Sequence, residues 1–298
     1  MKKIILTVGT LLMISNLAFA KSSGTTIADF VKLGINARPV AMGEAFSAAA
    51  DDAHAMHYNP AGLAGLTKQE VSFSHLSYVA LINYDNVQYV HPTSNGTFGA
   101  EIKFLHAKDE RRDEQGNKLG SFYDYNSAVS IAYAKSASKN LDYGFTLKVL
   151  QMKLDDETGT SAAIDAGLLY TLSEKINLAL VMQNLGFKMK IANDEGNLPA
   201  NVKFGISYKF IEQALIAADI NIPFEGEKSF SIGSEYSPVK LLAIRVGYKF
   251  REQGNLLGGV DGLTAGVGFM IKGYSLDYAF VPFGEFTETH RVSLKIKF

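Results

Sequence analysis

The chain has 298 residues, a length that suits one large all-β domain or two domains of ordinary size. Its formal net charge of −1 gives no support for a nucleic-acid partner, which would need a basic stripe. Cysteine is absent, so disulfides and thiolate sites are excluded. A mean hydropathy of +0.04 excludes a bundle of membrane helices, but it is compatible with a membrane β-barrel, in which apolar and polar residues alternate.

The N-terminus has the pattern of a secretory signal peptide. Lys2 and Lys3 supply the positive charge, an apolar run follows them, and Ala18 and Ala20 flank one residue in a small-x-small cleavage site. The apolar run is too short for a membrane-spanning helix. We therefore predict that residues 1–20 are a signal peptide, cleaved after Ala20, and that the mature chain leaves the cytoplasm.

Residues 21–66 differ from the rest of the chain and are predicted to form an N-terminal segment that is partly helical. The segment is rich in Ala and Gly, and residues 41–50 have helical potential. Asn59 and Pro60 form a turn signal, so a helix is expected to end at or before Tyr58. No further helix is predicted after this segment.

Residues 67–298 are predicted to form a membrane β-barrel of about fourteen antiparallel strands. Apolar and polar residues alternate in segments of about ten residues, which is the pattern of strands with one apolar and one polar face. The predicted strands are 71–79, 85–90, 97–106, 122–134, 142–153, 161–172, 175–185, 202–210, 214–222, 228–236, 241–250, 263–272, 274–280 and 289–298.

The connections between these strands favour a membrane barrel over a soluble β-sandwich. From the second strand onward, short and long connections alternate, as they do in outer-membrane barrels with short periplasmic turns and long external loops. Residues 107–121 and 154–160 are predicted to be two of the external loops. The first connection, 80–84, is an exception because it is short where a long loop is expected. The predicted location is the bacterial outer membrane, with lipid and the barrel-assembly machinery as partners.

The last strand is predicted to close the barrel by pairing with the strand that begins near Val71. Val292 and Leu294 belong to the face that would contact lipid, whereas Arg291 belongs to the face that would line the lumen. Phe298 ends the chain and is predicted to be the barrel-assembly signal. We expect deletion of Phe298 to lower the yield of folded barrel before it changes transport, which the heat-dependent mobility of the barrel on a gel would measure.

Along the predicted strands, charged residues of both signs lie on the face opposite to the apolar residues. These charged residues are predicted to point into the lumen. Small residues lie among them, and fourteen strands enclose more space than side chains alone can fill. The lumen is therefore predicted to contain another element, and the N-terminal segment is the candidate plug. The charges predicted to face the lumen are Glu101, Lys103, Lys148, Asp165, Lys203, Asp219, Arg245 and Arg291.

Three stretches of the predicted plug resemble the opening of a known family. Residues 30–46 read FVKLGINARPVAMGEAF, residues 50–52 read ADD, and residues 58–63 read YNPAGL. Together they resemble the PorV/PorQ family of outer-membrane proteins, within the barrels similar to the long-chain fatty-acid transporter FadL. The resemblance implies a fourteen-strand barrel with an N-terminal plug in its lumen.

The chain departs from the pattern of that family at three plug positions. Glu44 stands where the family often has Gly, and His54 and His57 replace small or hydroxyl and aromatic residues. His54 and His57 share one face if their segment is helical, so either a metal site or simple hydrogen bonding inside a wet lumen is compatible with the sequence. No third ligand follows at a recognisable spacing, and neither a metal nor a cofactor is predicted.

Two functions remain open for this architecture. The first is passive uptake of small hydrophobic molecules, and the second is the part that PorV-like proteins play in a type IX secretion system, in which the partners would be other secretion proteins. An enzyme is not predicted, because no Gly-x-Ser-x-Gly nucleophile motif is present. An open aqueous porin is disfavoured by the apolar plug. The residues predicted to gate the plug are Met42, Gly43, Asn59, Pro60, Ala61 and Gly62.

Overall fold

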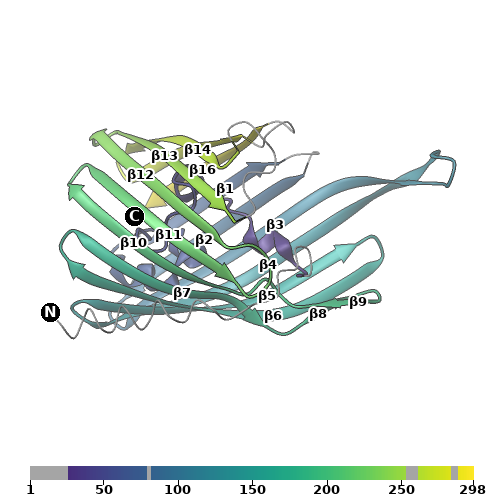
Figure 1. Ribbon diagram of the computed structural model, residues 1–298, viewed down its shortest axis with the longest axis horizontal. Coiled ribbons are helices and arrows are strands. Elements are labelled where there is room, and N and C mark those ends of the chain that lie inside the picture. The colour runs from purple at the N-terminus through teal and green to yellow at the C-terminus, as the bar shows by residue number, and fades with distance from the viewer. Residues whose placement is uncertain (1–25, 79–81, 253–260, 283–287) are drawn as a thin grey trace.

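A computed structural model describes residues 26–78, 82–252, 261–282 and 288–298. Within these residues, fourteen antiparallel strands form one closed barrel around an N-terminal plug (Figure 1). The predicted fold class is therefore confirmed. The predicted signal peptide lies outside the described residues.

Each barrel strand is paired with its neighbours in sequence, except that β7 pairs with β10 and β1 pairs with β16. The short strands β8 (Met189–Ile191) and β9 (Asp194–Gly196) form a separate hairpin in the connection between them. The barrel strands are β1 (Glu70–Ser77), β2 (Asn83–Thr93), β3 (Gly96–Arg112), β4 (Lys118–Ser138), β5 (Leu141–Leu154), β6 (Glu157–Ser173), β7 (Ile176–Gly186), β10 (Asn201–Ile211), β11 (Ala214–Pro223), β12 (Ser229–Val239), β13 (Leu242–Arg251), β14 (Leu263–Ile271), β15 (Tyr274–Pro282) and β16 (Glu288–Lys297).

The barrel closes where β1 pairs with β16, as the alternation of the last strand predicted. The register runs from Glu70 opposite Lys297 to Ser77 opposite His290. The backbone N–H of Phe298 extends the pairing by donating to the carbonyl of Gln69 at 3.1 Å. Neither end of the sheet is left as a free edge, which is the physical advantage of closure. We call the β1–β16 junction the seam.

The prediction that residues 107–121 and 154–160 form long external loops is wrong. The pairing of β3 with β4 continues from Ala107 opposite Asp124 to Arg111 opposite Gly120, and β5 reaches β6 through a short turn after Leu154. The strands continue through these charged stretches because pairing between strands satisfies the backbone N–H and C=O groups. The charged side chains are well solvated in the water beyond a membrane. The β3–β4 hairpin consequently projects well past the other strands (Figure 1).

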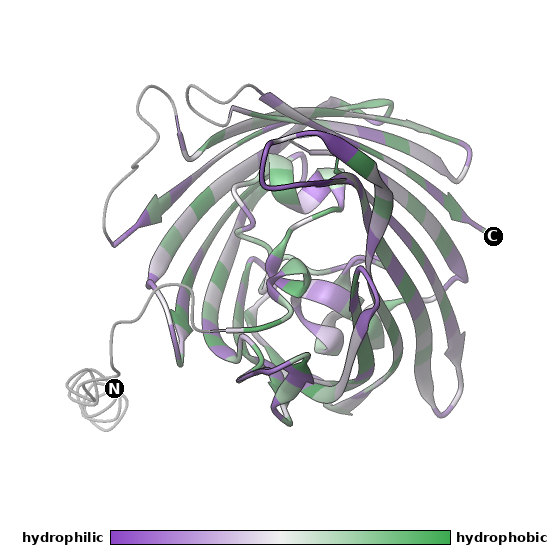
Figure 2. Cartoon of the chain, turned by 90° about the vertical axis from the view of Figure 1, so that its right-hand side faces the viewer, coloured by the Kyte–Doolittle hydropathy of each residue, from purple (hydrophilic) through white to green (hydrophobic). Residues whose placement is uncertain are grey.

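The two faces of the barrel wall have opposite character. Large apolar side chains point outward and are exposed in the isolated chain, as Ile102, Val149 and Ile244 show with exposed fractions of 56%, 56% and 49%. Hydrophobic and hydrophilic bands alternate along the strands in the end-on view (Figure 2). Such an outward apolar face matches hydrocarbon and is typical of barrels of the outer-membrane type.

The plug fills the lumen with short helices and turns (Figure 2). Its elements are η2 (Asp29–Lys32), α2 (Ala37–Ala41), α3 (Ala55–Tyr58) and η3 (Pro60–Gly65). Among the described residues, none of the helices has the length and apolarity that a membrane crossing requires.

Of the two helix predictions for the plug, one is confirmed and the other is wrong. The predicted end of a helix at Tyr58 is confirmed, since α3 ends there. The predicted helical potential over residues 41–50 is wrong, because Gly43 and Glu44 have φ of +65° and +66°. These left-handed values end α2 and turn the backbone toward the barrel wall.

Candidate functional site: the plug and its contacts with the wall

Glycines on the inner wall receive the backbone of the plug. A Cβ atom added at Gly247 of β13 would lie 2.1 Å from the backbone N of Gly43, and one at Gly233 of β12 would lie 2.2 Å from the carbonyl oxygen of Met42. No side chain fits in such a space. The small residues of the predicted lumen face are therefore docking positions for the plug. Met42 and Gly43 lie against β12 and β13.

The Asn59–Gly62 turn docks on another part of the wall. A Cβ atom added at Gly144 of β5 would lie 2.4 Å from the carbonyl carbon of Pro60, and one at Gly167 of β6 would lie 2.1 Å from Asn59 Oδ1. Pro60 begins the η3 helix, and the N–H of Ala61, its second residue, donates to Asn59 Oδ1 at 3.1 Å. The predicted gating residues thus occupy two separate docking areas.

Asn59 also joins its own turn to another part of the plug and to the barrel wall. Its Nδ2 donates to the carbonyl of Ser47 at 2.9 Å, inside the plug, and to the carbonyl of Leu168 at 3.2 Å, on β6. Gly62 packs so closely on the plug that an added Cβ atom would lie 2.2 Å from the carbonyl oxygen of Ala50. This geometry fastens the turn and makes it an anchor of the plug.

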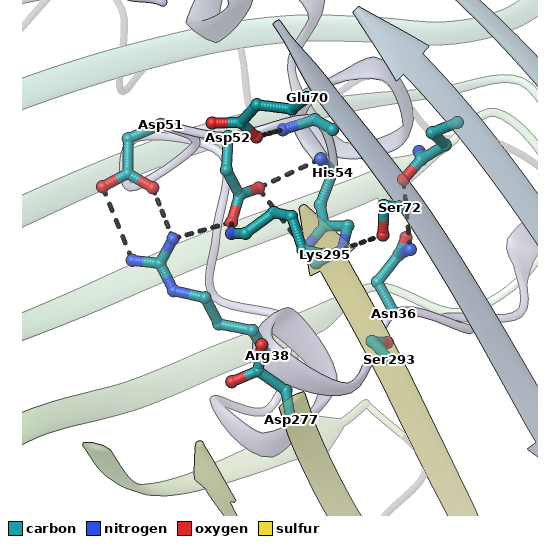
Figure 3. A network of polar contacts seen from close by, with 12 residues as sticks. Asn36, Arg38, Asp51, Asp52, His54, Glu70, Ser72, Asp277, Ser293 and Lys295 are labelled. Carbon is teal, nitrogen blue, oxygen red and sulfur yellow. Dashed lines mark hydrogen bonds and ion pairs between the residues drawn. The ribbon is translucent and has the colours of Figure 1, made fainter. Parts of the chain in front are cut away.

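A buried network of charges fastens the plug on the side of the seam (Figure 3). Arg38 of α2 bonds Asp51 at 2.5 Å, Asp52 at 3.0 Å and Glu235 of β12 at 2.8 Å. Asp52 also pairs with Lys295 of β16. Burial opposes ionisation of Asp52, but the neighbouring cations hold its pKa well below its usual range.

The same network continues along the wall. Arg245 Nε donates to Glu235 Oε2 at 2.6 Å, and its NH1 donates to Asp277 Oδ1 of β15 at 2.7 Å. Glu235 therefore lies between Arg38 of the plug and Arg245 of the wall. Each buried charge of this network has an opposite charge next to it, which offsets the cost of its desolvation.

Further hydrogen bonds connect the plug to both strands of the seam. The N–H of Ala53 donates to Glu70 of β1 at 2.9 Å, and His54 Nε2 lies 3.0 Å from Ser72 Oγ, also on β1. On β16, Ser293 Oγ accepts from the N–H of Ala37 at 2.9 Å. The plug therefore bridges β1 and β16 from inside the barrel at several levels.

The eight predicted lumen charges all lie on the inner wall. Seven of them are buried, and Lys203 is only partly buried. Lys148 pairs with Asp165 at 2.5 Å, and Lys103 pairs with Glu101 at 3.3 Å. Arg245 pairs with Glu235 and Asp277 on the wall. The other three charges contact the plug: Asp219 accepts from the backbone N–H groups of Phe46 and Ser47, Lys203 lies over the ring of Tyr58, and Arg291 donates to the carbonyl of Gly34.

His54 and His57 bind different parts of the wall. His54 lies next to Asp52 and Ser72, whereas His57 Nδ1 lies 2.7 Å from Lys103 Nζ. Burial lowers the pKa of His54 to about 4. Burial, together with the charge of Lys103, lowers the pKa of His57 well below its usual value. Within the described residues, no group of three or more His, Asp or Glu side chains has the arrangement of a metal site.

Of the residues in the seam network, the sequence prediction named only Arg245 as a site residue. Arg38, Asp52 and Glu235 are the central ones, and each is separated from its partners by many positions in the chain. One signal could have pointed to them. Arg38 and Asp52 are charges inside a segment rich in Ala and Gly that was predicted to fill the lumen, and buried charges require partners.

Among the described residues, the plug borders cavities at both ends of the barrel. A cavity of about 380 Å³ opens at the end of the barrel with the longer connections, and Glu44, Lys203, Asp219 and Lys249 are among its lining residues. A neighbouring cavity of about 150 Å³ shares Glu44 and Lys249 with it. A third cavity, of about 220 Å³, lies at the end with the short turns. The plug separates the third cavity from the other two.

Comparison with known proteins gives one family match and one curated relative. The model of an uncharacterised protein family (UPF0164) matches residues 16–150. A UPF0164 protein from Treponema pallidum (strain Nichols) is 23% identical over 289 residues, which cover 86% of this chain and 65% of the relative. The chain thus spans about 65% of the length of that relative.

Solved structures with the same architecture come from transport proteins. The Ralstonia pickettii toluene transporter TbuX has a TM-score of 0.62 at 15% identity and covers 89% of this chain and 98% of its own. A Pseudomonas aeruginosa FadL homologue has a TM-score of 0.61 at 10% identity, with coverages of 93% and 99%. The Pseudomonas putida toluene transporter TodX has a TM-score of 0.60 at 14% identity, with coverages of 83% and 94%. At such low identity, the likeness shows that this chain has the barrel fold of the FadL-like channels.

Proposed function

We propose that this chain is a bacterial outer-membrane channel for passive uptake of small molecules with an apolar body. The observation that carries the proposal is the closed barrel whose lumen holds its own plug, with cavities on both sides of that plug. An outward apolar wall suits lipid, and a plugged lumen suits selective passage better than free diffusion of water-soluble compounds. The toluene transporters TbuX and TodX have the same fold, which supports this function.

The chemistry of the larger cavity narrows the class of molecule. Most of its lining residues are polar, and Val31, Leu33, Pro199 and Pro223 supply the apolar contacts. Such a mixture favours a ligand that combines an apolar body with a hydrogen-bonding group over a pure hydrocarbon, because unpaired polar groups in a site lose their hydration.

The export route is part of the same proposal. The signal peptide would direct the chain out of the cytoplasm, and cleavage after Ala20 would leave the plug as the new N-terminus. Phe298, at the end of the closing strand, would serve the barrel-assembly machinery. A role in type IX secretion rests only on the sequence resemblance to PorV and PorQ, and no contact or cavity of the described residues favours it.

Uptake by intact cells tests the proposal. Cells that express the chain, and matched cells that carry an empty vector, would receive labelled p-cresol or labelled toluene, and initial uptake rates would be measured. We expect the chain to raise uptake of both compounds, with the larger increase for p-cresol, which has a hydroxyl group. Equal rates with and without the chain would contradict transport, and a larger increase for toluene would contradict the need for a hydrogen-bonding group.

A further inference from the structure

The plug is held unevenly around the barrel. On the seam side, buried ion pairs connect Arg38 and Asp52 to Glu235 and Lys295. On the opposite side, the segment Phe46-Ser47-Ala48 faces β10 and β11 and has no charged side chain. This segment therefore cannot form ion pairs. Hydrogen bonds fasten its backbone, and the Phe46 ring packs against Tyr58 and Arg38.

Two cavities approach each other along β10 and β11. On the inward face of β10, Lys203 lines the large cavity, whereas Ser207 lines the cavity at the short-turn end. On β11, Asp219 lines the large cavity, whereas Leu215 lines the cavity at the short-turn end. Because side chains alternate along a strand, one inward-facing residue remains between the cavities on each strand. These residues are Gly205 on β10 and Ala217 on β11.

Both separating residues are small, so the plug completes the barrier. The N–H groups of Phe46 and Ser47 donate to Asp219 Oδ2 at 3.2 and 3.0 Å. Ser207 Oγ donates to the carbonyl of Ala48 at 2.8 Å. A Cβ atom added at Gly205 would lie 3.0 Å from Ser47 Cβ. The barrier is thus one short plug segment laid across a gap that the wall leaves unfilled.

We propose that the passage between the two ends of the barrel opens here, by movement of the Phe46-Ser47-Ala48 segment away from Gly205 and Ala217, while the seam side of the plug stays in place. This inference rests on the proposed uptake function, because it names the route that an entering molecule takes. Asp219 and Ser207 hold the segment closed. Asn59 Nδ2 also donates to the carbonyl of Ser47, so this hydrogen bond has to break as the segment moves. The bond from Asn59 to Leu168 of β6 and the ion pairs of the seam network keep the rest of the plug in place.

A disulfide across the barrier tests the route in the full-length chain. The natural sequence has no cysteine, so the pair Ser47→Cys and Gly205→Cys introduces one possible disulfide. The spacing of the two Cβ positions, 3.0 Å, requires a small adjustment to reach the usual separation of about 3.8 Å. As a matched control, the pair Ser74→Cys and Ser293→Cys replaces hydroxyl groups that lie 2.7 Å apart across the seam.

Uptake of labelled p-cresol by cells would be measured with each pair oxidised and then reduced. We expect oxidation to lower uptake at least tenfold in the barrier pair and to leave the seam pair unchanged, with full recovery after reduction. Wild-type cells without uptake above the empty vector would defeat the proposed function. Wild-type uptake together with unchanged uptake through the cross-linked barrier would defeat the route alone.

A second variant tests the route without any cross-link. Asp219→Asn combined with Ser207→Ala weakens the hydrogen bonds that hold the segment. We expect uptake of p-cresol to rise at least twofold in this variant, because the closed position of the segment is destabilised. Uptake at the wild-type rate in a folded barrel would overturn the assignment of Asp219 and Ser207 as the residues that keep the passage closed.

Discussion

Replacement of Asp52 with alanine is expected to lower the unfolding free energy of the barrel by about 3–5 kcal/mol. Asp52 is buried and pairs with both Lys295 and Arg38. Arg38 keeps Asp51 and Glu235 in the variant, but Lys295 is left as a buried ammonium group without this partner. A buried charge that has lost its partner is far more costly than a missing surface pair. Urea titration in detergent, followed by the shift of the folded band on a gel, measures the effect.

Asp51 supplies the matched control for this prediction. Its carboxylate binds the same Arg38, but its side chain is 65% exposed. Asp51→Ala is therefore expected to cost no more than about 1 kcal/mol, as exposed ion pairs usually do. Equal stability losses in the two variants would show that burial of the network does not determine its contribution.

A double variant separates the ion pair from the packing around it. Asp52→Ala combined with Lys295→Met removes both charges, so no ammonium group is left unpaired. The double variant is expected to recover part of the stability that Asp52→Ala alone loses, which is a coupling between neighbouring sites. A double variant less stable than the single one would mean that Lys295 has sufficient stabilising contacts without Asp52.

Removal of residues 27–66 is expected to convert the barrel into an open pore for polar solutes. The plug occupies the lumen with α2, α3 and η3, and a wall of fourteen strands encloses more space than its own side chains fill. Without the plug, water and small sugars would pass between the two ends. Swelling of liposomes in sugar solutions measures this passage, and we expect a rate at least tenfold above that of the intact chain.

The folded state of the shortened chain needs its own check, because the plug bridges β1 and β16 from inside. Heat-dependent mobility on a gel reports whether the barrel has closed, and Asp51→Ala, with its plug intact, provides a non-leaking comparison. A closed barrel without residues 27–66 that swells liposomes no faster than the intact chain would contradict the plug as the barrier. The same preparation would also show whether uptake of p-cresol loses its preference over toluene.

The order and pairing of the strands could be predicted from the sequence, whereas their lengths could not. Alternation between lipid-facing and lumen-facing residues is a local property of each strand, so Val292, Leu294 and their neighbours revealed it directly. The charged stretch of the β3–β4 hairpin does not follow that alternation, because a ribbon in water needs no apolar face. Its strands were therefore predicted to end too early.

In the plug, too, features set by adjacent residues were predictable, whereas features set by contacts with distant residues were not. The end of α3 at Tyr58 depends on the Asn59-Pro60 sequence that follows it, and was predictable. The break after α2 depends on Met42 and Gly43 meeting Gly233 and Gly247 on strands nearly two hundred residues away. Helix propensity over the Ala-rich residues 41–50 contains no information about that contact.

By itself, the sequence determined that this chain is a closed barrel with an inward polar face and a separate N-terminal segment, because periodicity and turn residues are properties of short stretches. Only the tertiary structure decided what the segment does inside the barrel. It showed that Arg38, Asp52 and Lys295 come together at the seam, and that Gly205 and Ala217 leave a gap that Ser47 covers. These relations join residues far apart in the chain through the curvature of the closed wall, and no local pattern of residues specifies them.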